Sequence, residues 1–111
     1  MNYRRGDVVT CAAPGEFGKP RPAVVVQSDL FNESHASVTL CPITSHEVDA
    51  PLFRVPLKPT AANGLKHQSY VMADKLTTVR AEQIGSVMGR LSEADFQLVE
   101  DAVMLWLGLR G

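Results

Sequence analysis

Short runs rich in β-branched residues alternate with polar, Gly- and Pro-containing segments from Gly6 to about Arg90 and predict β-strands. Each run contains Val or Ile, which pack well on a half-buried sheet surface, and Gly, Pro or Asn residues separate the runs. The predicted strands are residues 7–12, 22–27, 37–43, 52–57, 69–73 and 84–89. Their short, closely spaced pattern favours a small barrel or sandwich over βαβ units.

After Arg90 the pattern becomes helical. Ser92 is placed to cap a helix, acidic residues follow in its first turn, and Gly108 is placed to end it. One face carries Phe96, Val99, Val103 and Trp106. In residues 102–109 apolar side chains surround almost the whole helix. This is a larger apolar surface than one small barrel is expected to cover. A dimer or partner surface explains this excess, and so does simple core packing.

The length of 111 residues fits one domain, residues 1–111. Apolar residues make up 45% and charged residues 21%, as in soluble globular chains. The longest apolar stretch, 102–109, is far shorter than the roughly 20 residues of a membrane span. Arg4 and Arg5 are not followed by the apolar region of an export signal. We therefore expect a cytoplasmic protein without a membrane segment.

Net charge and cysteine spacing limit the kinds of ligand and reaction that the chain can support. Eleven Lys and Arg against twelve Asp and Glu give a net charge of −1, so nucleic-acid binding must depend on a local patch. Cys11 and Cys41 lie in apolar runs without CxxC spacing, which favours buried, reduced thiols over a disulfide, a metal site or a nucleophile. No metal-ligand spacing, phosphate loop or nucleophile motif is present, so we expect no metal and no cofactor.

Four short segments, taken together and in this order, indicate a protein family. They are residues 5–9 (RGDVV), 21–26 (RPAVVV), 41–45 (CPITS) and 70–74 (YVMAD), followed by the helix over 91–107. With these segments the chain resembles the PemK/MazF family of bacterial toxin–antitoxin endoribonucleases. The resemblance implies a mainly β fold with a C-terminal α-helix, a small SH3-like barrel of the PemK/MazF/CcdB-like kind.

The resemblance also implies an activity and partners. Members of the family are toxins that cut single-stranded RNA, mRNA included, at short sequence motifs. The ribose 2′-hydroxyl attacks the adjacent phosphate, and no metal takes part. The resemblance further implies a homodimer and a cognate antitoxin protein that neutralises the toxin.

Metal-free cleavage needs a base, an acid and donors that stabilise the charge on the phosphorane. Arg21 is the candidate for the charge, because its planar fork matches a phosphate and it stands where a loop enters a strand. Without the family motif around it, Arg21 would be interpreted as an ordinary charged residue on the surface. Thr44 is a candidate hydroxyl donor in the site, and Ser45 a candidate contact to RNA. Turn capping after Pro42 is the other interpretation, for Ser45 above all.

Asp74 lies in the segment where some family members place a catalytic acidic residue. There it would act as base or orient an arginine, although an ordinary turn aspartate is the alternative. Met72 stands two residues earlier, where certain members carry a catalytic arginine. The sequence therefore offers no Arg–Asp pair from this strand and leaves more of the work to Arg21 and Thr44.

Loop positions suggest which residues contact RNA. Two loops, residues 13–20 and 59–64, are rich in Gly and Pro or contain the Asn-Gly turn signal. Phe17 is expected to stack on a base. The expected basic rim consists of Lys19, Arg21, Lys66 and Lys75. Histidine titrates in a range useful for proton transfer, but His35, His46 and His67 match no family motif; His67 is grouped with the RNA contacts.

Two other functions remain compatible with the sequence. The related gyrase-poisoning toxins share the barrel and bind a protein through the C-terminal helix, because a fold does not fix a function. A barrel that binds RNA or peptide without cutting is the second alternative, consistent with Met72 and the near-neutral charge. Arg21 and the 41–45 segment favour the nuclease, since a pure protein binder needs neither.

Overall fold

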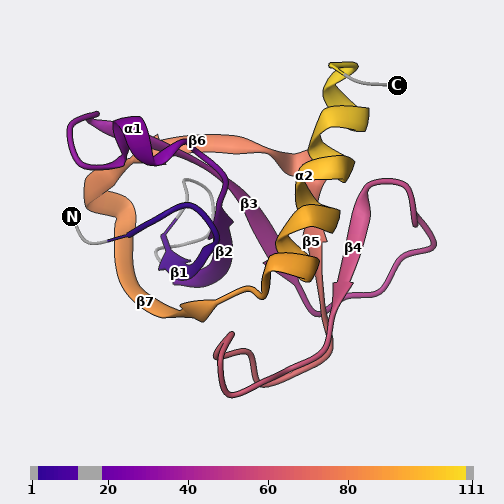
Figure 1. Cartoon of the computed structure of the whole chain (residues 1–111). Coiled ribbons are helices and arrows are strands. Elements are labelled where there is room, and N and C mark those ends of the chain that lie inside the picture. Colours follow the sequence, from indigo (N-terminus) through magenta and orange to yellow (C-terminus); the bar gives the residue numbers. More distant parts are fainter. Residues whose placement is uncertain (1–2, 13–18, 110–111) are drawn as a thin grey trace.

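Seven strands and a C-terminal helix make up the described part of the chain (Figure 1). The structure is a computed structural model that describes residues 3–12 and 19–109. Its elements are β1 (Asp7–Cys11), β2 (Arg21–Val25), α1 (Asp29–Asn32), β3 (Ser37–Thr44), β4 (Arg54–Leu57), β5 (Ser69–Met72), β6 (Thr77–Arg80), β7 (Ile84–Arg90) and α2 (Glu93–Leu107), with 3-10 turns η1 (Ala73–Lys75) and η2 (Ala81–Gln83) on either side of β6.

The strands form one antiparallel sheet in the order β4-β5-β3-β2-β1-β7, with β6 also paired to β3. The long strand β3 joins the two halves, because residues 37–40 pair with β6 whereas Ile43 and Thr44 pair with β5. Figure 1 shows β1, β2 and β7 curling round one side, while α2 lies beside β4 and β5 on the other. This confirms the predicted mainly β barrel with a C-terminal helix.

Two apolar clusters fill the fold because neighbouring residues in a strand face opposite sides. Val8 packs in the cluster under α2, which includes Val71, Val99 and Ala102. Val9 packs in a second cluster within the curled half, with Val38, Leu40 and Ile84. Cys41 and Cys11 fall in the first and second cluster, respectively, as buried free thiols. Burial, with a smaller effect of the Asp74 charge, raises the pKa of Cys41 to about 12.

The caps of α2 are those expected from the sequence. The Ser92 hydroxyl accepts a hydrogen bond from the Asp95 amide at 3.1 Å, which satisfies one free N–H of the first turn. Gly108 ends the helix in the left-handed region at φ 71°. Among the described residues, no helix has both the length and the apolarity needed to cross a membrane.

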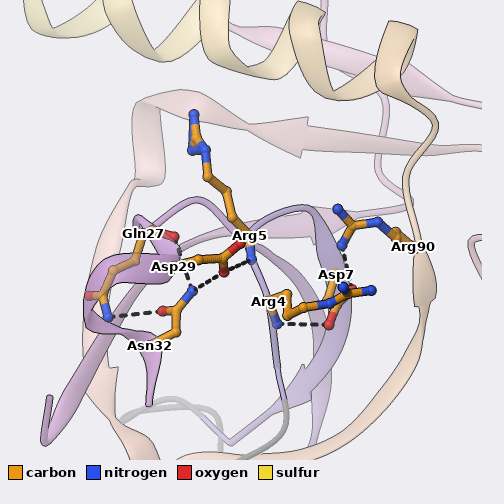
Figure 2. A network of polar contacts seen from close by, with 7 residues as sticks. All are labelled: Arg4, Arg5, Asp7, Gln27, Asp29, Asn32 and Arg90. Atoms are coloured by element: carbon orange, nitrogen blue, oxygen red, sulfur yellow. Dashed lines mark hydrogen bonds and ion pairs between the residues drawn. The ribbon is translucent and has the colours of Figure 1, made fainter. Parts of the chain in front are cut away.

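The RGDVV segment contacts both the first strand and the helix, and Figure 2 shows the part of this network around Asp7. The Asp7 carboxylate accepts hydrogen bonds from the Arg4 amide and the Arg90 guanidinium, both at 2.8 Å. Arg5 donates to the Val26 carbonyl at 2.7 Å and pairs with Glu100 on α2. The Arg5 guanidinium also lies 4.7 Å from the centre of the Phe96 ring. This segment therefore holds α2 against the barrel.

Two elements were not among the predicted ones. Strand β6 has the sequence TTVR, with only Val79 buried, so its alternation was too brief to recognise. Helix α1 is a single four-residue turn capped by Ser28, whose hydroxyl accepts from the Leu30 amide. Strand β4 also begins two residues later than predicted, at Arg54, because Leu52 lies 68% exposed in the preceding turn.

Candidate active site

A cleft of about 460 Å³ opens where β2 begins, β3 ends and the chain enters β5. We call it the main cleft. Five of the predicted site residues line it, namely Arg21, Thr44, Ser45, Lys66 and His67. None of the described residues that line it is acidic, so the described part of the cleft is locally positive on a chain of net charge −1. This is the local patch that binding a polyanion requires.

Strand pairing fixes the polar side of the main cleft. Arg21 is the first residue of β2 and lies opposite Cys11 of β1 in the register, with its side chain exposed. Thr44 is the last residue of β3 and lies opposite Tyr70 of β5. The Thr44 hydroxyl accepts from the His46 amide at 3.1 Å. The turn-capping role considered for Ser45 therefore belongs to Thr44, whose own hydroxyl hydrogen can still be donated to a ligand.

A rigid turn presents Lys66 and His67 to the main cleft. The Asn63 side chain is buried, donates to the Lys58 carbonyl at 2.9 Å and accepts from the amides of Thr60 and Leu65 at 3.0 Å. The Ser69 hydroxyl then donates to the His67 carbonyl at 2.8 Å. The sequence showed the Asn-Gly turn but not this network, because the network depends on which carbonyls the turn brings near Asn63.

Gly64 in this turn is expected not to tolerate a side chain. Its φ is 72°, and a Cβ there would lie 2.3 Å from the Met88 carbonyl oxygen. Gly64→Ala should therefore lower the free energy of unfolding by about 2 to 3 kcal/mol through backbone strain and crowding. Urea unfolding measures this change. Gly108→Ala is the control: it has a similar φ of 71° but open space around the Cβ, so it isolates the strain from the crowding.

Asp74 lies in η1, outside the main cleft, and is paired with Arg54. The Arg54 Nε and Nη2 donate to the two Asp74 carboxylate oxygens at 2.8 and 3.1 Å, and each side chain is only 13% exposed. Arg54 lies opposite Met72 in the register of β4 and β5. Strand β5 carries Met72 and no arginine, as the sequence showed, and the arginine that pairs with Asp74 comes from β4, where no motif pointed to it.

The ion pair changes what Asp74 can do chemically. Its hydrogen bonds to Arg54 hold the pKa of the Asp74 carboxyl below its ordinary value of 3.8 and raise the pKa of Arg54. A carboxylate with a lowered pKa and both oxygens engaged is a weak base. Asp74 is therefore better placed to orient Arg54 than to deprotonate a ribose hydroxyl.

The same pair predicts a pH-dependent contribution to stability. Because folding lowers the pKa of Asp74, its stabilising effect is fully present above pH 3.8 and disappears as the pH falls through the lower folded value. Asp74→Asn should lower the free energy of unfolding by about 2 kcal/mol at pH 7. Denaturant unfolding at pH 7 and near pH 2.5 measures this. An equal difference between the two proteins at both pH values would contradict the ion pair.

The remaining predicted contacts lie elsewhere. Lys19 precedes β2 and Lys75 belongs to η1; both are exposed, but neither lines the main cleft. The predicted basic rim is thus reduced to Arg21 and Lys66 within the cleft itself. Phe17 lies outside the described residues. In the part of the chain that the structure describes, no three His, Cys, Asp or Glu side chains gather as metal ligands.

Comparison with known proteins decides the family. The sequence model of the PemK-like, MazF-like toxins of type II toxin–antitoxin systems matches residues 4–107, which include all four segments and the helix. The chain belongs to this family. A probable endoribonuclease MazF from Mycolicibacterium smegmatis is 44% identical over 109 residues, 97% of this chain and 99% of that one. Endoribonuclease MazF9 from Mycobacterium tuberculosis is 29% identical, over 96% and 97% of the two chains.

Solved structures agree with this assignment. An endoribonuclease in complex with its cognate antitoxin, from a mycobacterial species, superimposes with a TM-score of 0.83 at 25% identity, over 98% of each chain. The Mycobacterium tuberculosis toxin MazF-mt6 shares the fold, with a TM-score of 0.81 over 95% of this chain and 99% of that one. Together with the curated relatives, they identify the chain as a MazF-like endoribonuclease and favour the nuclease over the gyrase-binding interpretation.

Proposed function

We propose that this chain is the toxin of a toxin–antitoxin pair and cuts single-stranded RNA, mRNA included, in the main cleft without a metal. The observation that supports this most strongly is the composition of the cleft. It combines an arginine, a lysine, hydroxyl groups and a histidine, and none of the lining residues that the structure describes carries a carboxylate. These are the groups that bind a phosphate diester and move protons around it.

Arg21 and Lys66 supply the positive charge in this mechanism. The planar Arg21 guanidinium binds two non-bridging phosphate oxygens and stabilises the charge that develops on the phosphorane. Lys66 adds a second cation at the cleft wall, and Thr44 and Ser45 donate hydroxyl hydrogens. Because these donors are held by strand ends and a rigid turn, they need little rearrangement when the charge forms.

His67 is the proposed proton-transfer group. The 2′-oxygen loses its proton and bonds to phosphorus, and the bond from phosphorus to the 5′-oxygen breaks as that oxygen gains a proton. The products are a 2′,3′-cyclic phosphate and a 5′-hydroxyl. Histidine is the side chain suited to such transfers near neutral pH, and His67 is the histidine among the lining residues of the main cleft. Asp74 lies outside the main cleft, where it orients Arg54 and takes no part in these proton transfers.

We also propose the two protein partners that the family implies. An antitoxin segment rich in acidic and apolar residues would cover the main cleft and mask Arg21. A second copy of the chain would cover the exposed part of α2, where Leu98, Leu105, Trp106 and Leu107 are each between 43% and 52% exposed. Several large exposed apolar side chains on one helix are typical of a surface that another chain covers.

Cleavage of a long single-stranded RNA in EDTA tests the proposal. The wild-type protein should produce discrete cuts with cyclic phosphate ends, and Arg21→Ala and Thr44→Ala should lose them while remaining folded. Cuts that require added Mg²⁺ would exclude the metal-free mechanism. Intact RNA at high protein concentration would favour a toxin that binds a protein, and α2 would then be the surface to mutate.

A further inference from the structure

A second cleft, of about 580 Å³, borders the main cleft across strand β5. It is lined by Glu47, Asp49, Arg54, Pro56 and Tyr70, among others. We call it the second cleft. In the register, Tyr70 lies between Thr44 of β3 and Pro56 of β4. Because Thr44 lines the main cleft and Tyr70 the second, the two clefts meet at β5.

Strand alternation places both clefts on one face of the sheet. Val55 and Val71 are buried in the cluster under α2, so Arg54, Tyr70 and Met72 face the other side. Met72 lines the main cleft and Tyr70 the second. Neighbouring strands are about 4.8 Å apart, so a nucleotide attached to a phosphate in the main cleft can reach the second cleft.

The charge of the second cleft differs from that of the main cleft. Arg54 is neutralised by its ion pair with Asp74, which leaves the carboxylates of Glu47 and Asp49 as the unbalanced charges lining it. A phosphate is repelled by such a site, whereas the N–H groups on the edge of a base are attracted to it. The second cleft is therefore suited to a base rather than to the RNA backbone.

Tyr70 and Arg54 supply the other contacts that a base requires. The Tyr70 ring is half-buried and therefore held in place, as a stacking platform must be. Asp74 engages Nε and Nη2 of Arg54 and fixes the plane of the guanidinium, which has further N–H groups to donate. Donors from an arginine match the O6 and N7 acceptors of guanine. Carboxylates match its N1–H and N2–H donors.

We propose that the second cleft binds an unpaired guanine adjacent to the scissile phosphate and so contributes to the choice of RNA sequence. Tyr70 stacks on the base, Arg54 donates to its O6 and N7 edge, and Glu47 and Asp49 accept from its N1 and N2 edge. Tyr70 and the two carboxylates are specificity-determining residues, and Asp74 is the positioning residue for Arg54. The inference rests on the proposed RNA cleavage in the main cleft.

A binding experiment separates this subsite from the chemistry. Cleavage of a randomised RNA pool gives the preferred sequence, and a short RNA with a 2′-deoxy sugar at the cut position then binds without being cut. Fluorescence anisotropy measures the Kd with guanine, inosine, 7-deazaguanine or uracil at the flanking position. We expect guanine to bind roughly tenfold more tightly than inosine, which lacks the N2 amine, and 7-deazaguanine, which lacks N7.

The variants assign that preference to the second cleft. Tyr70→Leu, which removes the aromatic ring but keeps apolar volume, should weaken binding of every such RNA roughly tenfold. The double variant Glu47→Gln and Asp49→Asn, made at exposed positions, should bind guanine and inosine equally. Glu33→Gln, an exposed acid at the end of α1, is the matched control and should change nothing.

The outcomes distinguish this inference from the proposed function. The double variant could bind and cut RNA normally and keep the guanine preference. That result would overturn the proposed guanine subsite and leave the proposed nuclease activity standing. The absence of any flanking guanine preference in the wild-type cuts would overturn it in the same way. A wild-type protein that neither binds nor cuts RNA would overturn both. Loss of discrimination in the double variant, with cutting retained, would establish the subsite.

Discussion

Arg21→Ala is expected to slow RNA cleavage by about thirtyfold to a thousandfold, which corresponds to about 2 to 4 kcal/mol of transition-state stabilisation. The side chain lines the main cleft at the first residue of β2, where the backbone is held by pairing with β1. Its loss removes the group that we propose to bind the phosphorane oxygens. The fold should survive, because the Arg21 side chain is exposed and lies outside both apolar clusters.

The measurement is kcat/KM on a short RNA containing the mapped cut site, with thermal unfolding as the control for folding. Lys19→Ala removes an exposed cation two residues away that does not line the cleft, and it should have a much smaller effect. Arg21→Lys keeps the charge but loses the planar fork, so it should recover only part of the activity. A folded Arg21→Ala protein that cleaves at the wild-type rate would exclude Arg21 from the reaction.

The sequence alone predicted most of the strands and the C-terminal helix, because residue patterns and helix caps that lie close together in the chain determine these elements. Alternating Val-rich runs predicted the strands, and the Ser92 and Gly108 caps predicted the helix that the structure places at Glu93–Leu107. Strand β6 was missed because a four-residue strand with one buried side chain has almost no periodic signal. Burial of both cysteines followed from the apolar runs around them and is confirmed.

The candidate site was predicted only in part, because a site depends on register as well as on motifs. Arg21, Thr44 and Ser45 lie on family segments and do line the main cleft. Arg54 lies on no motif, and only the pairing of β4 with β5 brings it opposite Met72, where it reaches Asp74. The pairing register of β4 with β5 cannot be read from a single sequence, so the Arg54–Asp74 ion pair could not be predicted.

The motifs also combine structural and functional roles that the sequence does not separate. Residues 5–9 lie within the family match as residues 41–45 do, yet Asp7 accepts from Arg90 and so holds β1 to β7, as Figure 2 shows, and Arg5 pairs with Glu100 of α2. Neither Asp7 nor Arg5 lines the main cleft. Within the 41–45 segment, Thr44 both caps a turn and lines the cleft. Only the positions of the side chains show which role each residue has.

His67→Gln is expected to lower kcat/KM by about a hundredfold to ten thousandfold, about 3 to 5 kcal/mol, which is the contribution of one positioned acid or base. Glutamine retains a polar side chain of similar size but does not titrate. Its pH profile should therefore lack any dependence on a protonatable group at this position. The measurement is kcat/KM from pH 5 to 9 for both proteins.

Two controls make the role of His67 specific. His46→Gln changes an exposed histidine beside the main cleft that does not line it, and it should keep both the rate and the pH profile. An RNA with sulfur in place of the scissile 5′-oxygen has a leaving group that needs no proton. If His67 is the acid, the variant should cut this RNA almost as fast as the wild type; if it is the base, the defect should persist. If the His67→Gln variant cut both substrates at the wild-type rate at every pH, His67 would be excluded from proton transfer.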